Sequence, residues 1–215
     1  MMEKGVSASA GTKKRILDVA ERLFGERGYA ATSLRAVTVA AGANVAAVNY
    51  HFGSKEGLLR AVVDRAMGPV NEARQRLLDG FLADGGKPEV ADLVEGFVRT
   101  GADLTRPREG GAAAVARFLG RVMCEPDPEI RRLFADEVGA VEGRYLEELT
   151  RALPALSAAE VAFRYRVMIG LLALHQAGAL ADLAPRGVSD GSSPEGPDEE
   201  TERLVATVLA VFRAP

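Results

Sequence analysis

Apolar residues along the chain recur at the three- and four-residue spacing of α-helices, and no segment shows the alternation of half-buried strands. Residues 12–27 are expected to form an amphipathic helix that Thr12 caps and Gly28 ends, preceded by a flexible tail over residues 1–11. One face of this helix carries Ile16, Val19, Ala20, Leu23 and Phe24. The pattern predicts an all-α protein with about nine helices.

Two short helices and one long helix are predicted next. Thr32 or Ser33 caps the first short helix, which Gly42 closes. Asn44 caps the second, which runs through His51, and Ser54 caps the long one. Because the turn around Gly42 is short, the two short helices must cross steeply, which is the geometry of a helix-turn-helix.

Helical periodicity continues to the end of the chain. The fourth helix meets Gly68-Pro69, but its apolar pattern resumes at once, so a kink is expected there rather than an end. Pro88 is expected as the first residue of the next helix. Further helices are predicted over residues 88–104, 112–124, 127–152, 157–183 and 198–213, with a mobile loop over 184–198. The chain thus divides into a helix-turn-helix domain over residues 12–53 and a larger helical domain over 54–215.

The charge of the chain is distributed unevenly. The formal net charge is -3, yet residues 1–60 carry nine Lys and Arg against five Asp and Glu, a net of about +4. The remaining residues carry 18 basic against 25 acidic side chains, about -7. A basic N-terminal segment followed by an acidic remainder is typical of a phosphate-binding module attached to a domain that does not bind DNA. Such asymmetry also arises from differently solvated faces.

Cysteine content and apolar runs indicate a cytoplasmic protein. The only cysteine, Cys124, cannot form an internal disulfide and has no metal-ligand neighbour in sequence, which favours a reducing compartment. The first residues show no apolar segment typical of a secretory signal. The longest apolar run, Val167 to Leu174, is far shorter than the roughly 20 residues that a membrane span requires. No membrane partner is expected.

Polar side chains at the ends of the short helices suggest contacts with DNA phosphates. Ser33 and Arg35 lie where a helix N-terminus and a guanidinium can bind phosphate. Tyr50 and His51 end the second short helix, and Lys55 places a cation beside the N-terminus of the next one, a position that an anion would relieve. His51 as a metal ligand is the rival interpretation, but no second ligand follows at helical spacing.

Three segments in this region resemble the DNA-binding domain of the tetracycline-repressor (TetR) family. They are Thr32-Ser33-Leu34-Arg35, Ala41-Gly42-Ala43-Asn44 and the run from Val48 to Leu59, and the similarity covers about residues 12–65. The resemblance implies a two-fold homodimer on a palindromic operator, made through the last two helices, with an effector pocket in each subunit. It also implies that the effector moves the fourth helix. This movement would change the separation of the two reading helices, which are the second short helix of the helix-turn-helix in each subunit.

The resemblance also implies roles for individual residues. The residues at phosphate-contact positions are Thr32, Ser33, Arg35, Tyr50, His51 and Lys55. Those at the start of the reading helix and on its base-facing side are Asn44, Val45, Ala46, Ala47 and Asn49. Many relatives have polar or bulky residues where this chain has Val45-Ala46-Ala47, so base reading is expected to depend on thymine methyl contacts and on Asn49, whose amide can address adenine.

The larger domain offers candidates for an effector pocket and for a subunit interface. An adaptable apolar pocket is predicted from Phe97, Phe118, Met123, Phe134, Met168 and His175, although these residue types are more often core and His175 is more often a satisfied core or interface histidine. The predicted dimer interface comprises Leu171, Leu174, Leu204, Val205, Val208, Leu209 and Phe212. Packing within one subunit is the alternative for the last helix.

The function expected from these features is that of a sequence-specific transcription regulator, a repressor that a small apolar effector releases from a palindromic operator. The alternatives are a DNA-binding or architectural protein without a ligand and an all-helical enzyme. The chain has only two histidines and lacks the usual hydrolase, metalloprotease and phosphate-loop motifs, so no enzymatic activity, metal or cofactor is expected.

Overall fold

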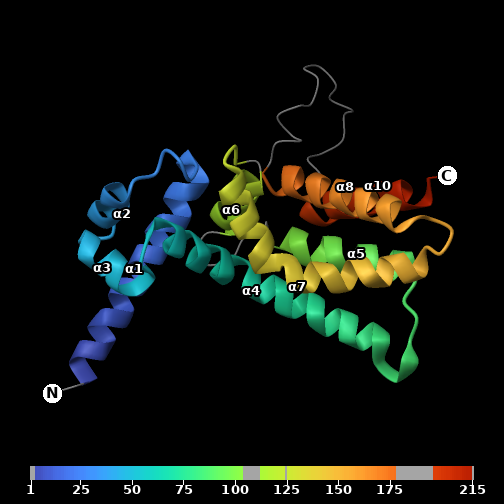
Figure 1. Ribbon diagram of the computed structural model, residues 1–215, viewed down its shortest axis with the longest axis horizontal. Coiled ribbons are helices and arrows are strands. Elements are labelled where there is room, and N and C mark those ends of the chain that lie inside the picture. The colour runs from blue at the N-terminus through green and yellow to red at the C-terminus, as the bar shows by residue number, and fades with distance from the viewer. Residues whose placement is uncertain (1–2, 104–111, 124, 178–195, 215) are drawn as a thin grey trace. The chain divides into compact units, whose positions relative to one another are not determined.

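The computed structural model describes residues 3–103, 112–123, 125–177 and 196–214 (Figure 1). These residues form nine α-helices and one short 3-10 helix, with no strand among them, which confirms the all-α prediction. The chain divides into two compact units, each described here by itself. The first comprises Met1–Gly68 and Ala114–Glu137, and the second comprises Pro69–Ala113 and Val138–Pro215.

The first unit is built around the helix-turn-helix. Helices α1 (Glu3–Arg27), α2 (Leu34–Ala40) and α3 (Val45–Phe52) contact one another, and α4 (Lys55–Leu82) begins three residues after α3 ends (Figure 1). The predicted stripe of α1 is confirmed for four of its five residues, because Ile16, Ala20, Leu23 and Phe24 are buried. They share the core with buried Val37, Val48, Leu58 and Leu59.

Helix α1 begins at Glu3, so the prediction of a flexible tail over residues 1–11 with a helix start at Thr12 is wrong. Residues 3–11 contain no proline, and extending a helix that is already nucleated fixes few dihedral angles for each new hydrogen bond. The Thr12 hydroxyl accepts a hydrogen bond from the Arg15 guanidinium at 3.1 Å.

The predicted caps of the short helices are confirmed. Ser33 Oγ accepts from the Ala36 N–H at 3.1 Å, and Asn44 Oδ1 accepts from the Ala47 N–H at 2.9 Å. Ser54 Oγ accepts from the Gly57 N–H at 3.0 Å at the start of α4. The turns between these helices place Gly28, Gly42 and Gly53 at positive φ, a region that favours glycine.

Helix α4 continues through Pro69, as predicted, and ends at Leu82. A 3-10 turn (η1, Ala83–Gly85) follows, and α5 then spans Val90–Ala102. The prediction that Pro88 opens this helix is wrong by two residues. The backbone N–H of Glu89 donates to Asp92 Oδ2 at 3.0 Å. The Asp92 carboxylate thus stabilises the N-terminus of α5, with Glu89 as the capping residue.

The second unit is a bundle in which α10 (Pro197–Arg213) packs on α5 and α8 (Ala158–Gln176) (Figure 1). Its buried core also takes residues from α7 (Pro128–Ala152), including Val141, Tyr145 and Leu149. Helix α6 (Ala112–Met123) precedes α7. Cys124, the end of the helix predicted over 157–183 and most of the predicted loop over 184–198 lie outside the described residues.

The described helices include none that is long and apolar enough to cross a membrane.

Candidate nucleic-acid interface

Helix α3 is held by one buried residue and exposes the rest of its surface. Val48 is fully buried, whereas Val45, Ala46 and Asn49 are exposed. Two turns of helix are too short to be stable alone, so the packing of α3 on α1 and α2 keeps it folded. The predicted base-facing residues Val45, Ala46 and Asn49 therefore lie on the solvent side, with Ala47 half-buried.

Two of the predicted phosphate-contacting side chains are open to solvent at the ends of the motif. The Tyr50 side chain is 82% exposed at the end of α3, and Arg35 is exposed in the first turn of α2. The Tyr50 ring meets the ring of half-buried His51 edge-on, with centroids 5.0 Å apart. This contact orients the tyrosine hydroxyl without burying it. Ser33, also exposed, caps α2 two residues before Arg35.

Thr32 does not fit its predicted role in phosphate binding. It is only 1% exposed, and its hydroxyl lies 2.8 Å from the Gly28 carbonyl and 3.1 Å from the Leu23 carbonyl. A buried hydroxyl that donates to the main chain is not available to DNA. Thr32 therefore ties the turn after α1 to the start of α2, and its predicted phosphate contact is wrong.

Lys55 is anchored to the turn that follows α1. Its Nζ donates to the Tyr29 carbonyl at 2.7 Å and lies 4.0 Å from the centre of the Tyr29 ring. The Tyr29 hydroxyl in turn donates to Glu56 Oε1 at 2.9 Å. An ammonium group has three donors, so two remain for a phosphate. Tyr29 thus positions the start of α4, a role that the sequence analysis did not assign.

Burial and hydrogen bonding shift the titration of this cluster. Burial lowers the pKa of Lys55, against the opposing effect of the Glu56 and Glu125 carboxylates. Hydrogen bonds from the Glu56 backbone N–H and from the Ser54 and Tyr29 hydroxyls lower the pKa of Glu56. Burial and the Glu56 carboxylate raise the pKa of Tyr29. Glu56 is therefore ionised and Tyr29 protonated near neutral pH, which keeps their hydrogen bond intact.

Val39 extends the exposed apolar surface of the motif and was not identified from the sequence. It is 74% exposed near the end of α2, and Val45 at the start of α3 is 42% exposed. Large apolar side chains at such positions lose contact with water only when a partner covers them. In the sequence, Val39 lies on a different face of α2 from the apolar residues that are predicted to be buried. An apolar residue outside the buried face could therefore have indicated this surface.

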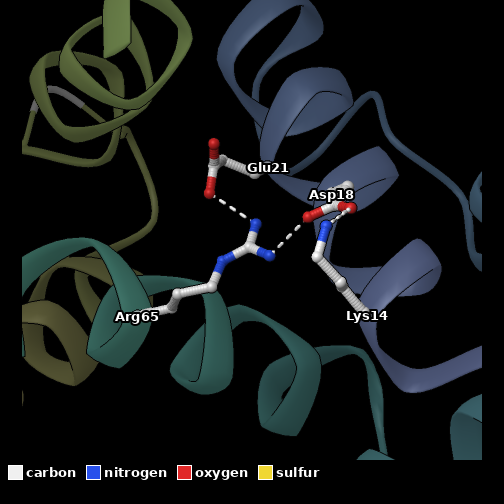
Figure 2. Close-up of polar contacts among 4 residues, drawn as sticks. All are labelled: Lys14, Asp18, Glu21 and Arg65. Atoms are coloured by element: carbon white, nitrogen blue, oxygen red, sulfur yellow. Dashed lines mark hydrogen bonds and ion pairs between the residues drawn. The ribbon is translucent and has the colours of Figure 1, made fainter. Parts of the chain in front are cut away.

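Ion pairs join α4 to α1 within the same unit. Figure 2 shows Arg65 of α4 between two carboxylates of α1, with Nη1 2.6 Å from Asp18 Oδ1 and Nη2 2.5 Å from Glu21 Oε2. Lys14 reaches the other oxygen of Asp18 at 2.9 Å. These bridges link the first half of α4 to α1 of the helix-turn-helix unit.

Two sequence profiles of one family match the chain. The profile described as "Bacterial regulatory proteins, tetR family" matches residues 16–62, and the one described as "Tetracyclin repressor-like, C-terminal domain" matches residues 95–211, which is more than half of the chain. The chain belongs to the TetR family. The predicted resemblance over about residues 12–65 is thereby confirmed, and the second profile extends the similarity to the larger domain.

Individual TetR-family proteins match over shorter stretches. The regulatory protein RaaS of Mycobacterium tuberculosis is 30% identical over 119 residues, which is 55% of each chain. The repressor KstR2 of Rhodococcus jostii is 37% identical over 70 residues, 31% of this chain and 34% of that protein. The chain thus spans about a third to a half of the length of these curated relatives.

Solved structures of the TetR family share the fold over nearly the whole chain. A cysteine mutant of the regulator CifR, in complex with a 26-base-pair operator DNA, matches with a TM-score of 0.61 and 23% identity over 94% of this chain and 95% of that chain. A likeness at this identity shows the fold.

The predicted effector-pocket residues fall in both units. Phe97 and Met168 belong to the buried core of the second unit. In the first unit, Phe118 is buried and stacks on Phe24 with ring centroids 6.3 Å apart, and Phe134 is also buried. Met123 is half-buried in the same unit. His175 Nδ1 of α8 lies 3.3 Å from Glu200 Oε1 of α10. This contact between two helices of one chain agrees with the alternative of a satisfied core or interface histidine.

Most of the predicted dimer-interface residues on α10 face the interior of their own subunit. Leu204, Val205, Val208 and Phe212 are at most 7% exposed within a single chain, and all belong to its core. Because α5 and α8 of the same chain cover that face, these four side chains leave little surface for a second subunit, as in the alternative of packing within one subunit. Leu171 and Leu209 are half-buried, and Leu174 is 37% exposed, so these three retain surface for a partner.

Proposed function

We propose that this TetR-family chain is a homodimeric transcription repressor that binds a palindromic operator and is released by a small molecule with a largely apolar body. The observation that carries the proposal is the surface of α3. A single buried valine, Val48, anchors this helix, while Val45, Asn49 and Tyr50 are exposed as a group. A regulator of this kind acts in the cytoplasm on chromosomal DNA, and the proposal assigns it no enzymatic step.

Charge supports DNA as the partner of this surface. Residues 1–60 are net positive in a chain whose formal net charge is -3. Arg35, Tyr50 and the two unused donors of Lys55 can hold phosphates on either side of the reading helix. The exposed methyl groups of Val45 and Ala46 suit thymine, and the amide of Asn49 suits adenine.

An exposed apolar stripe on α8 supports a second copy of the chain as the other partner. Phe163 is 55% exposed and Leu174 is 37% exposed. Eleven residues make about three full turns, so the two side chains lie on one face of α8, with Val167 and Gly170 between them. A palindromic operator requires a two-fold dimer, and such a stripe is self-complementary across a two-fold axis.

Selection of bound sequences from a random DNA pool tests the proposal. The expected result is a palindromic motif whose half-sites lie about one helical turn apart, and an affinity that falls steeply as salt rises. Arg35→Ala should weaken all sequences alike and flatten the salt dependence. Arg76→Ala removes another exposed positive charge outside the motif and should change neither. Enrichment of no motif, together with salt-independent binding, would exclude an operator-binding role.

A further inference from the structure

The core of the second unit contains an arginine that no carboxylate contacts directly. Arg74 of α4 is 3% exposed, and its direct contacts in the described part of the chain are all to uncharged groups. Its Nε lies 3.3 Å from Thr100 Oγ1, and its Nη2 lies 3.3 Å from the Phe97 carbonyl oxygen. The guanidinium also lies 3.5 Å from the centre of the Phe97 ring. These contacts leave Nη1 without a hydrogen-bond acceptor among the described residues.

A second buried arginine of the same unit shows how such a charge is ordinarily satisfied. Arg164 of α8 is 5% exposed, and its Nε donates to Glu160 Oε1 at 2.7 Å. Its Nη1 donates to carbonyl groups at the end of α10, including that of Ala214 at 2.7 Å. Buried charges in proteins are paired and hydrogen-bonded in this way because their removal from water is costly. Arg74 is as buried as Arg164, but no carboxylate contacts it as Glu160 contacts Arg164.

Two buried polar atoms near Arg74 lack a partner in the described part of the chain. They are the Tyr165 hydroxyl and Asn71 Oδ1. Asn71 lies one turn before Arg74 on α4, and the Tyr165 ring stacks edge-on against Phe97 with centroids 5.5 Å apart. By contrast, the hydroxyl of neighbouring Tyr145 donates to the Arg74 carbonyl at 3.2 Å. An unpaired buried polar atom costs stability and needs an explanation, and binding of a polar ligand group is one.

Glu142 is the acidic group that acts electrostatically on this cluster. It is half-buried and interacts with Arg74 and Tyr165 through space, while the described hydrogen bonds of Arg74 go to Thr100 and the Phe97 carbonyl. Burial raises the pKa of Glu142, against the opposing effect of Arg74. Burial likewise lowers the pKa of Arg74, and the Glu142 carboxylate opposes that shift without a direct contact.

We propose that Arg74 and Tyr165 bind the carboxylate of the effector, whose apolar body lies against the core around Phe97. The guanidinium and the phenol supply donors to the two carboxylate oxygens, and Asn71 Oδ1 accepts from an N–H or O–H group of the same molecule. This inference rests on the proposed function, because it names the chemical class of the effector. A purely structural Arg74 would be satisfied as Arg164 is.

Binding of defined carboxylates to the full-length protein tests this site. Decanoate and 3-phenylpropionate each carry one carboxylate on an apolar body, and their primary amides have nearly the same shape without the charge. Isothermal titration should show at least one of the two acids binding about tenfold or more tightly than its amide. Arg74→Met should weaken that acid by about 10- to 100-fold and leave the amide nearly unchanged, as expected for the loss of charge-assisted hydrogen bonds.

Matched variants separate recognition from folding. Arg164→Met removes an equally buried arginine and should preserve the preference for the acid over the amide. Tyr165→Phe removes a hydroxyl that has no described partner, so it should fold normally and weaken the acid by about three- to tenfold. If Arg74→Met does not fold, Tyr165→Phe decides the question.

The site is rejected if neither acid binds, if acid and amide bind equally, or if Tyr165→Phe binds the acid as the wild type does. All three results are obtained without DNA. Failure to select an operator would reject the proposed function instead, so the two failures are distinguishable.

Discussion

At the scale of single residues, the proposed function divides the exposed side chains of α3 into those that position DNA and those that read it. Tyr50 and Asn49 are both exposed on this helix. We propose that the phenol at its end contacts the phosphate backbone and that the amide in its middle contacts base edges. Because Val45, Ala46 and Ala47 offer only methyl groups, we expect hydrogen-bonded discrimination to be concentrated at Asn49.

Replacing Asn49 by Ala should therefore relax specificity at one base pair in each half-site. The expected loss is about 1–3 kcal/mol at that base pair, with non-specific affinity nearly unchanged. Tyr50→Phe is the control, because losing a phosphate contact lowers the affinity for every sequence by a similar factor. Titrations with the selected operator and its single-base variants measure both. An unchanged base preference in Asn49→Ala would assign the reading to methyl contacts or to DNA shape.

Two buried tyrosines in the second unit should respond oppositely to the same substitution. Tyr145→Phe removes a hydrogen bond to the Arg74 carbonyl and should lower the free energy of unfolding by about 0.5–1.5 kcal/mol. Tyr165→Phe removes a buried hydroxyl without a described partner, so stability should stay the same or rise slightly. Urea unfolding of the two variants in the absence of ligand provides the comparison. Equal losses would mean that the Tyr165 hydroxyl has a partner within the protein.

At the scale of elements, the close approach of α3 and α4 depends on one glycine. A Cβ atom on Gly57, in the first turn of α4, would lie 1.9 Å from the carbonyl oxygen of Phe52, the last residue of α3. That oxygen belongs to the main chain, so the clash cannot be relieved by a side-chain rotation. The end of the reading helix would have to move instead.

Gly57→Ala should lower the free energy of unfolding by about 1–3 kcal/mol and weaken operator binding. Gly139→Ala is the matched control, because Gly139 lies inside α7 with nothing within 4 Å of its added methyl group. That substitution should stabilise the protein by about 0.5–1 kcal/mol through helix propensity and leave DNA binding unaltered. Thermal unfolding and operator titration measure the pair. A Gly57→Ala protein with normal affinity would show that α3 tolerates the shift.

The ion pairs between α1 and α4 predict a pH-dependent contribution to stability. Burial raises the pKa of Asp18, but hydrogen bonds from Lys14 and Arg65 outweigh it and place this pKa below its ordinary value (Figure 2). A carboxyl group whose pKa is lower in the folded state stabilises the protein above its unfolded pKa of about 4. The contribution is lost as the pH falls through the folded pKa.

Wild type should therefore be more stable than Asp18→Asn at pH 7, and this difference should shrink below about pH 4. Because the Asp18 side chain is 46% exposed, the difference should be small and should also decrease at high salt. Denaturant unfolding at a series of pH values measures it. A difference that persists unchanged at low pH would locate the effect outside the ion pair.

At the scale of the whole molecule, the core of one subunit limits what its partner can contact. Removal of α10 would destroy the core, since Val208 and Phe212 are buried within their own chain, so truncation is a poor test of dimerisation. The exposed stripe on α8 offers point substitutions instead. A charge placed there disrupts a subunit interface without entering the core.

If the proposed dimer forms through this stripe, Leu174→Glu should yield a folded monomer that no longer binds a palindrome cooperatively. Leu77→Glu on α4 is the matched control, because Leu77 is 38% exposed and Leu174 is 37% exposed. Light scattering gives the mass of each variant, and circular dichroism confirms that both remain helical. A Leu174→Glu protein that stays dimeric would place the subunit interface elsewhere.

Local signals in the sequence were sufficient to identify the helix-turn-helix and its family. The caps Ser33, Asn44 and Ser54 and the glycine at position 42 act within a few residues of the chain, so their effects can be predicted without knowledge of distant contacts. The continuation of α4 through Pro69 was predictable for the same reason, from the periodicity on both sides.

Only the tertiary structure showed which side chains are already buried or hydrogen-bonded within their own subunit. Periodicity identified an apolar face on α10, but only its packing on α5 and α8 showed that this face belongs to the core. Thr32 matched a phosphate-binding position in sequence, yet its hydroxyl is buried against the main chain. The sequence gives no sign that Arg74 is buried without a carboxylate, because burial and pairing depend on residues from α5 and α8 that are distant along the chain. A helical pattern determines which residues share a face, whereas the partner of that face is determined by the packing of the whole chain.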